Sequence, residues 1–94
     1  MTDDKLYRDI VRGARAKALI DDELLAEAFV RLDADYIAAW RTTPVRDTDA
    51  RERLWQATQI VGKVRDHLSA VLNNGKLARR QLDELAARAS RKRP

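Results

Sequence analysis

Residues 50–75 read ARERLWQATQIVGKVRDHLSAVLNNG, and this stretch decides the fold. Its apolar residues recur in alternating steps of four and three, at Ala50, Leu54, Ala57, Val61, Val64, Leu68 and Val71. Such spacing keeps side chains on one stripe of a helix with 3.6 residues per turn. Asn74-Gly75 then resembles a helix end, because glycine readily takes the left-handed conformation of a C-cap. We therefore predict a long amphipathic helix over about 49–74.

A second amphipathic helix is predicted upstream, over about 21–42. Its apolar residues also recur by fours and threes, at Leu25, Phe29, Leu32, Tyr36 and Ala39. Asp21 is the expected N-cap of this helix, and Thr48 or Asp49 that of the long helix. Pro44 ends the upstream helix, because the residue before a proline avoids the helical conformation.

These two segments determine the predicted architecture. Two helices joined by about five residues fold back on each other, so we predict an all-α antiparallel helical hairpin, about 21–42 and 49–74. A shorter helix is expected at each end, over about 3–18 and about 77–89. In the first of them the apolar residues at helical spacing are Leu6, Ile10, Val11 and Ala14. We predict a single helical domain over 1–89 and a flexible basic tail over 90–94.

Composition supports this helical prediction. The 94 residues are 45% hydrophobic and 36% charged, with only 3 Gly and 2 Pro. The chain has no Cys, which excludes disulfides and thiolate metal sites. No apolar run approaches the ~20 residues of a membrane span, and the acidic start does not resemble a signal peptide. We expect no membrane partner.

The charges are unevenly distributed along the chain. Residues 21–40 carry six acidic residues against Arg31 alone, whereas residues 76–94 carry seven basic residues against Asp83 and Glu84. The net charge of +4 therefore comes from the C-terminal end. Opposite charges in the two segments favour docking of one chain on another.

No group of residues points to catalysis. His67 is the only histidine, and its neighbours include no residue suited to act with it. Asp33 and Asp35 face different directions on a helix, and Glu23 and Glu27 lack an accompanying Glu-x-x-His motif. We expect no enzymatic activity, no catalytic residue, no metal, no cofactor and no small-molecule substrate.

Gly62 lies inside the predicted long helix, where glycine is unfavourable. Close approach of a second helix or of Trp55 would explain it, and so would a tolerated defect.

The two tryptophans suggest a surface for protein binding. Trp40 and Trp55 bracket the predicted connection, where they either close the end of the core or bind a partner. Trp and Arg dominate the hot spots of protein interfaces, and several arginines lie nearby in sequence. The candidate partner-binding residues are Trp40, Arg41, Arg51 and Trp55.

The basic C-terminal segment offers an alternative site. Its cations could neutralise phosphates, although no aromatic residue is interleaved for base stacking. It acts as a solvated tail, or it contacts an acidic protein or nucleic acid. The candidate nucleic-acid-binding residues are Arg79, Arg80, Arg88, Arg91, Lys92 and Arg93.

Several short motifs occur in a familiar order. These are Asp35-Tyr36-Ile37-Ala38-Ala39-Trp40, Arg51-Glu52-Arg53-Leu54-Trp55, His67-Leu68 and Asn74-Gly75-Lys76-Leu77-Ala78. Together with residues from about Ala16 onward, this order resembles small helical proteins of bacteriophages and prophages. The resemblance transfers no activity and no functional residue, but it implies an accessory, assembly or packaging role.

We therefore expect a non-catalytic assembly protein that binds itself, as a homodimer, or another phage assembly protein. Its expected location is the cytoplasm of the bacterial host or the virion. The alternative is an accessory protein that binds nucleic acid through its basic end.

Overall fold

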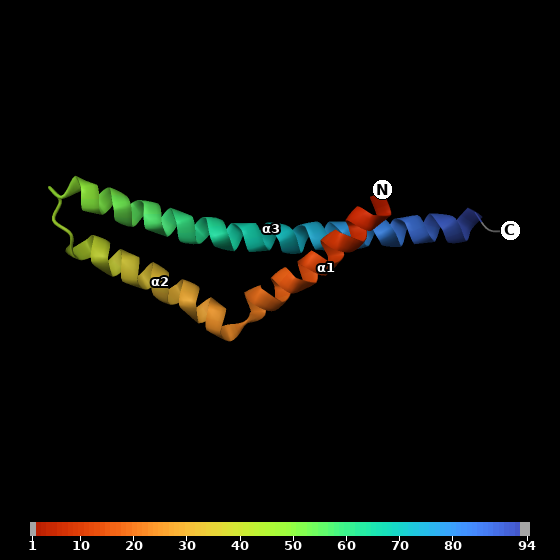
Figure 1. Cartoon of the computed structure of the whole chain (residues 1–94), viewed down its shortest axis with the longest axis horizontal. Helices are drawn as coiled ribbons and strands as arrows, with labels where there is room; N and C mark the ends of the chain where they lie inside the picture. Colours follow the sequence, from red (N-terminus) through yellow and green to blue (C-terminus); the bar gives the residue numbers. More distant parts are fainter. Residues whose placement is uncertain (1, 93–94) are drawn as a thin grey trace. The chain divides into compact units, whose positions relative to one another are not determined.

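A computed structural model describes residues 2–92, which contain three α-helices (Figure 1). Helix α1 spans Thr2–Asp21, α2 spans Glu23–Thr42 and α3 spans Thr48–Lys92. No strand occurs among these residues, so the all-α prediction is confirmed. The predicted tail is helical over 90–92, and its last two residues, Arg93 and Pro94, lie outside the described residues.

Helix α1 is longer than predicted and buries a different stripe. Its first turn carries two acidic residues, which favour the positive end of the helix dipole. Leu6, Gly13 and Ala16 are buried, whereas Val11 and Ala14 are exposed. Two of the three buried residues are a glycine and an alanine. A search for large apolar side chains at helical spacing therefore does not find this stripe.

Helix α2 begins one residue later than its predicted cap implies. The backbone N–H of Leu25 donates to Oδ1 of Asp22 at 2.9 Å, so Asp22 is the N-cap and the prediction of Asp21 is wrong. Asp22 has the extended backbone of a capping residue, whereas Asp21 still belongs to α1. The helix ends at Thr42, before Thr43 and Pro44, as predicted.

The cap of α3 also differs from the prediction. The N–H of Ala50 donates to Oδ1 of Asp47 at 3.2 Å, and the N–H of Arg51 donates to the Asp47 carbonyl oxygen at 3.1 Å. Thr48 and Asp49 are already inside the helix. Asp47 is therefore the N-cap, because its side chain accepts a hydrogen bond from the first turn of the helix.

Helix α3 does not end at Asn74-Gly75, and the prediction of a separate helix over 77–89 is wrong. The helix is continuous for 45 residues, and none of the glycines has a positive φ. The apolar repeat also continues past Val71 in the same steps of four and three, through Gly75, Ala78, Leu82, Leu85 and Ala89. Gly75 thus occupies a position of the stripe.

The contact of Gly75 with Gly13 explains why glycine stands there. A Cβ added to Gly13 would lie 2.8 Å from the Cα of Gly75, and one added to Gly75 would lie 2.9 Å from the carbonyl oxygen of Asp9. Carbon atoms pack best at about 3.5–4.0 Å, so only glycine fits on either side. The backbones of α1 and α3 therefore touch at this point.

Gly62 has no such neighbour. A Cβ added there would have nothing within 4 Å. Close approach of a second helix or of Trp55 is therefore not the reason for this glycine.

The chain divides into two compact units, each formed around part of α3. The α1 unit comprises Met1–Ile20 and Leu68–Pro94, and its buried side chains include Leu6, Ala16 and Ala78. The α2 unit comprises Asp21–His67; Val61 is buried in it, but no residue of α2 is. Helix α3 runs through both units, so this grouping does not divide the chain into separate domains. The single domain over 1–89 therefore stays a prediction.

Within residues 2–92, no helix combines the length and the apolar character that crossing a membrane requires.

Candidate functional site

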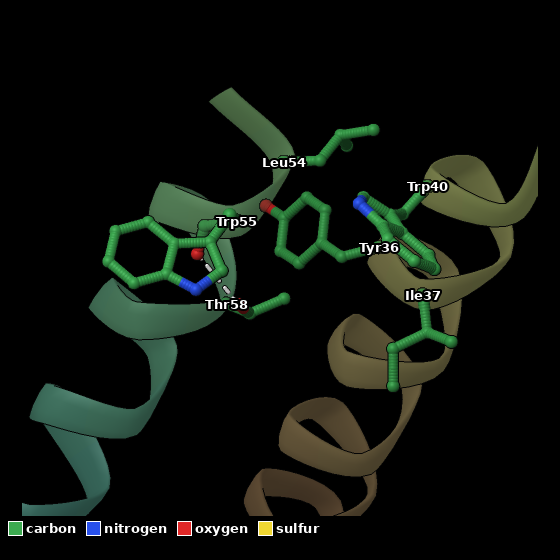
Figure 2. A pocket seen from close by; sticks show the side chains of 6 residues that line it. All are labelled: Tyr36, Ile37, Trp40, Leu54, Trp55 and Thr58. Carbon is green, nitrogen blue, oxygen red and sulfur yellow. Dashed lines mark hydrogen bonds between the residues drawn. The ribbon is translucent and has the colours of Figure 1, made fainter. Parts of the chain in front are cut away.

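The α2 unit contains an apolar pocket at the two tryptophans (Figure 2). This Trp pocket has a volume of about 150 Å³. Its walls come from α2 and from the first turns of α3, and the lining residues are Tyr36, Ile37, Trp40, Leu54, Trp55 and Thr58. The structure thus brings Trp40 and Trp55, two of the predicted partner-binding residues, to one pocket.

Helical spacing places these side chains together. Tyr36 and Trp40 are four residues apart on α2, and Trp55 and Thr58 are three apart on α3. In Figure 2 the Tyr36 ring reaches from α2 toward α3, with Trp40 on one side and Trp55 on the other. Hydroxyl Oγ1 of Thr58 donates to the Trp55 carbonyl oxygen at 2.7 Å, which directs the Thr58 methyl group away from that bond.

Both indoles remain accessible. Trp40 is 43% exposed and Trp55 is 60% exposed. A tryptophan on a partly desolvated apolar surface is typical of an anchor for a partner side chain.

Arg51 stabilises the edge of this pocket. Its guanidinium carbon lies 4.2 Å from the centroid of the Trp40 ring, and Nη1 donates to the Thr43 carbonyl oxygen at 3.2 Å. These contacts join the end of α2 to the start of α3. Both of these Arg51 contacts lie within the α2 unit. Arg41, by contrast, is exposed in the last turn of α2.

A second arginine joins the helices farther from the connection. Nη1 of Arg65 lies 2.9 Å from Oδ2 of Asp33, and its guanidinium carbon lies 5.0 Å from the Phe29 ring centroid. Asp33 therefore forms an ion pair with Arg65. This contact explains the position of one acidic residue of α2, and no metal ion is needed to explain it.

Five of the six predicted nucleic-acid-binding residues lie on α3 in the α1 unit, and the sixth, Arg93, lies outside the described residues. Arg79 pairs with Asp83 at 3.6 Å, and Nε of Arg91 donates to the Ala87 carbonyl oxygen at 3.4 Å. Arg80 and Arg88 are exposed, and Lys92 is the last residue of the helix. Arg88 also borders a shallow cavity of about 290 Å³ that is lined by Leu6, Gln81, Glu84 and Leu85.

Helix α1 adds basic residues that sequence analysis missed. In the α1 unit Lys and Arg outnumber Asp and Glu by 12 to 5, whereas in the α2 unit the acidic residues outnumber the basic ones by 10 to 7. The additional cations are Lys5, Arg8, Arg12, Arg15 and Lys17. They are far from the C-terminus in sequence, so only the packing of α1 on α3 could reveal the combined charge of +7.

Tyr36, Ile37, Leu54 and Thr58 were also missed as members of the candidate site. Their signal was present in the sequence, because each lies three or four residues from a tryptophan on the same helix or directly beside one. Which faces of the two helices meet could not be read from that spacing.

No catalytic or metal-binding group is evident among residues 2–92. No three His, Cys, Asp or Glu side chains in that range gather where they could hold a metal ion, and His67 is exposed. The absence of catalysis and of metals remains a prediction.

Comparison of the chain with known proteins gives no relative. No protein family, no curated protein and no solved structure matches it.

Proposed function

We propose that this chain is a non-catalytic assembly protein that acts by protein–protein contact through the α2 unit. The observation that carries the proposal is that α2, an amphipathic helix, buries none of its residues, and that Trp40 near its end and Trp55 on α3 both remain accessible. An apolar helix face of this kind needs a covering surface. The Trp pocket would accept an apolar side chain of that surface.

The same unit supports an antiparallel hairpin of α2 with the first half of α3. Trp40 contacts Arg51 near the connection, and Asp33 contacts Arg65 farther from it. Residues earlier in α2 thus pair with residues later in α3, which is the order that an antiparallel pair requires. A five-residue connection, 43–47, fits this arrangement.

A phage or prophage context follows from the resemblance of the motifs alone. In that context the partner is a second copy or another assembly protein, and the chain acts in the host cytoplasm or on the virion.

A photo-cross-linker at position 55 tests the proposed function. Trp55 is replaced by p-benzoylphenylalanine in the full chain, which is produced in the cells that naturally carry the gene and then irradiated. We expect a discrete covalent adduct with one protein, which mass spectrometry identifies. The adduct should disappear when Ile37→Arg places a charge in the Trp pocket.

The matched control is the same cross-linker at Gln56, an exposed neighbour that does not line the pocket. Equal adducts at both positions, or none at position 55, would contradict a binding role of the pocket.

A second candidate function is nucleic-acid binding by the α1 unit. The net charge of +7 in the sequence of that unit specifically favours it.

A further inference from the structure

Helix α1 carries a second apolar stripe that is exposed. Its members recur in steps of four, three and four, at Tyr7, Val11, Ala14 and Ala18. Tyr7 and Val11 are each 60% exposed. Helical geometry places this outer stripe about 100° or more around α1 from the buried residues Leu6 and Gly13. The packing of α1 on α3 therefore leaves it uncovered.

Helix α2 also carries an exposed outer stripe. Its members are Ala26, Val30, Ala34 and Ile37. Val30 is 64% exposed and Ile37 is 46% exposed. Ile37 also lines the Trp pocket, so this outer stripe is continuous with the candidate site.

The two outer stripes match in length and have oppositely charged edges. Each extends over three helical turns, about 17 Å. On α1 the exposed cations Arg8 and Arg15 follow Tyr7 and Ala14 directly. On α2 the exposed acids Glu23 and Glu27 lie beside the stripe, one turn apart. Charges at such edge positions choose the partner in helix–helix pairs.

We propose that the occupant of the α2 outer stripe is α1 of a second copy of this chain. In the proposed two-fold dimer the contact is reciprocal, so that α1 of each copy packs on α2 of the other. The opposite net charges of the two units, +7 and −3, favour the same pairing. This inference rests on the proposed function and names its partner.

Two charge-reversed variants test the reciprocal contact. One carries Arg8→Glu and Arg15→Glu, and the other carries Glu23→Lys and Glu27→Lys. Each variant alone opposes like charges, so we expect a monomer where the unchanged chain is a dimer. An equimolar mixture restores opposite charges at both contacts and should restore the dimer mass.

The masses are measured by sedimentation equilibrium at low salt, and circular dichroism checks that each variant keeps its helix content. The matched control is Arg80→Glu with Arg88→Glu, which makes the same charge change on an exposed part of α3 and should leave the dimer intact. Dimers that survive in both reversed variants would overturn the proposal, as would a mixture that stays monomeric.

Cysteine cross-linking tests the contact without changing its charges. The chain has no natural Cys, and Val11 and Val30 lie near the middles of the two outer stripes. Single variants Val11→Cys and Val30→Cys are mixed and oxidised. We expect the mixed disulfide to form several-fold faster than either disulfide between identical variants.

Faster formation of the disulfides between identical variants would contradict the proposed pairing. A monomeric mass of the unchanged chain at every concentration would also overturn the second copy as occupant. The proposed function would then still stand if the cross-linker at position 55 captures a different protein.

Discussion

The three glycines of this chain differ in what surrounds them. Gly13 and Gly75 touch each other through their backbones, whereas a Cβ on Gly62 would have nothing within 4 Å. The same residue type thus serves close packing at two positions of the α1 unit, and costs helix stability without a packing reason at the third.

Alanine substitutions should separate these roles. Gly75→Ala forces a methyl group against the α1 backbone, and we expect it to lower the free energy of unfolding by about 1–3 kcal/mol. Gly62→Ala removes the backbone entropy of glycine from the middle of α3 without a clash, and should raise that free energy by about 0.5–1 kcal/mol. Urea unfolding followed by circular dichroism measures both changes. A stabilising Gly75→Ala would show that α1 and α3 are not in backbone contact there.

At the scale of elements, the apolar period predicted where helices exist better than where they end. The apolar spacing shows the stripe of α3 from Ala50 to Val71, but Asn74-Gly75 predicts a helix end where the structure continues the helix. Asn-Gly carries a strong local preference for a C-cap. The period places the same glycine on the buried stripe, and only the contact with Gly13 shows which influence prevails.

The cap of α3 allows a direct test of an element boundary. Asp47→Ala removes the side-chain acceptor of the Ala50 N–H, so we expect a loss of about 1 kcal/mol in the free energy of unfolding. Asp49→Ala makes the same charge change inside the first turn and should cost less, about 0.3–1 kcal/mol. Chemical unfolding of both variants checks the order. Equal losses would indicate that charge near the helix end matters, and that the capping bond does not.

At the scale of the whole molecule, the packing of helices redistributes charge that is spread along the sequence. In the sequence the basic excess lies in the C-terminal segment, but α1 contributes five further cations to the same unit. The proposed nucleic-acid binding and the proposed self-association would therefore use overlapping basic residues, and they need separate tests.

The nucleic-acid alternative predicts that cations of both helices contribute to binding. Arg12→Gln with Arg15→Gln should weaken the affinity for a labelled DNA duplex and reduce its salt dependence, because fewer phosphates are neutralised. Arg41→Gln with Arg53→Gln makes the same charge change in the α2 unit and should have little effect. Fluorescence anisotropy at several salt concentrations measures both. No binding by the unchanged chain at low salt would exclude this alternative.

The candidate site was predicted in part. Trp40 and Trp55 were named from their positions beside the connection, and the pocket contains both. Arg51 was named for its residue type, but its stacking on Trp40 and its bond to Thr43 depend on which faces of α2 and α3 meet. The spacing of apolar residues in the sequence predicts which face of a helix is apolar. It does not predict which face of the other helix packs against it.

The sequence by itself determined the all-α class, the amphipathic character of α2 and α3 and the position of the connection at Pro44. These follow from local periodicity and from backbone preferences that act over a few residues. The tertiary structure alone decided that α3 continues through Gly75, that α1 turns Leu6 inward and Tyr7 outward, and that the cations of α1 join those of α3. Each of these depends on contacts between residues distant in sequence, where close approach of two backbones outweighs a local preference for ending a helix.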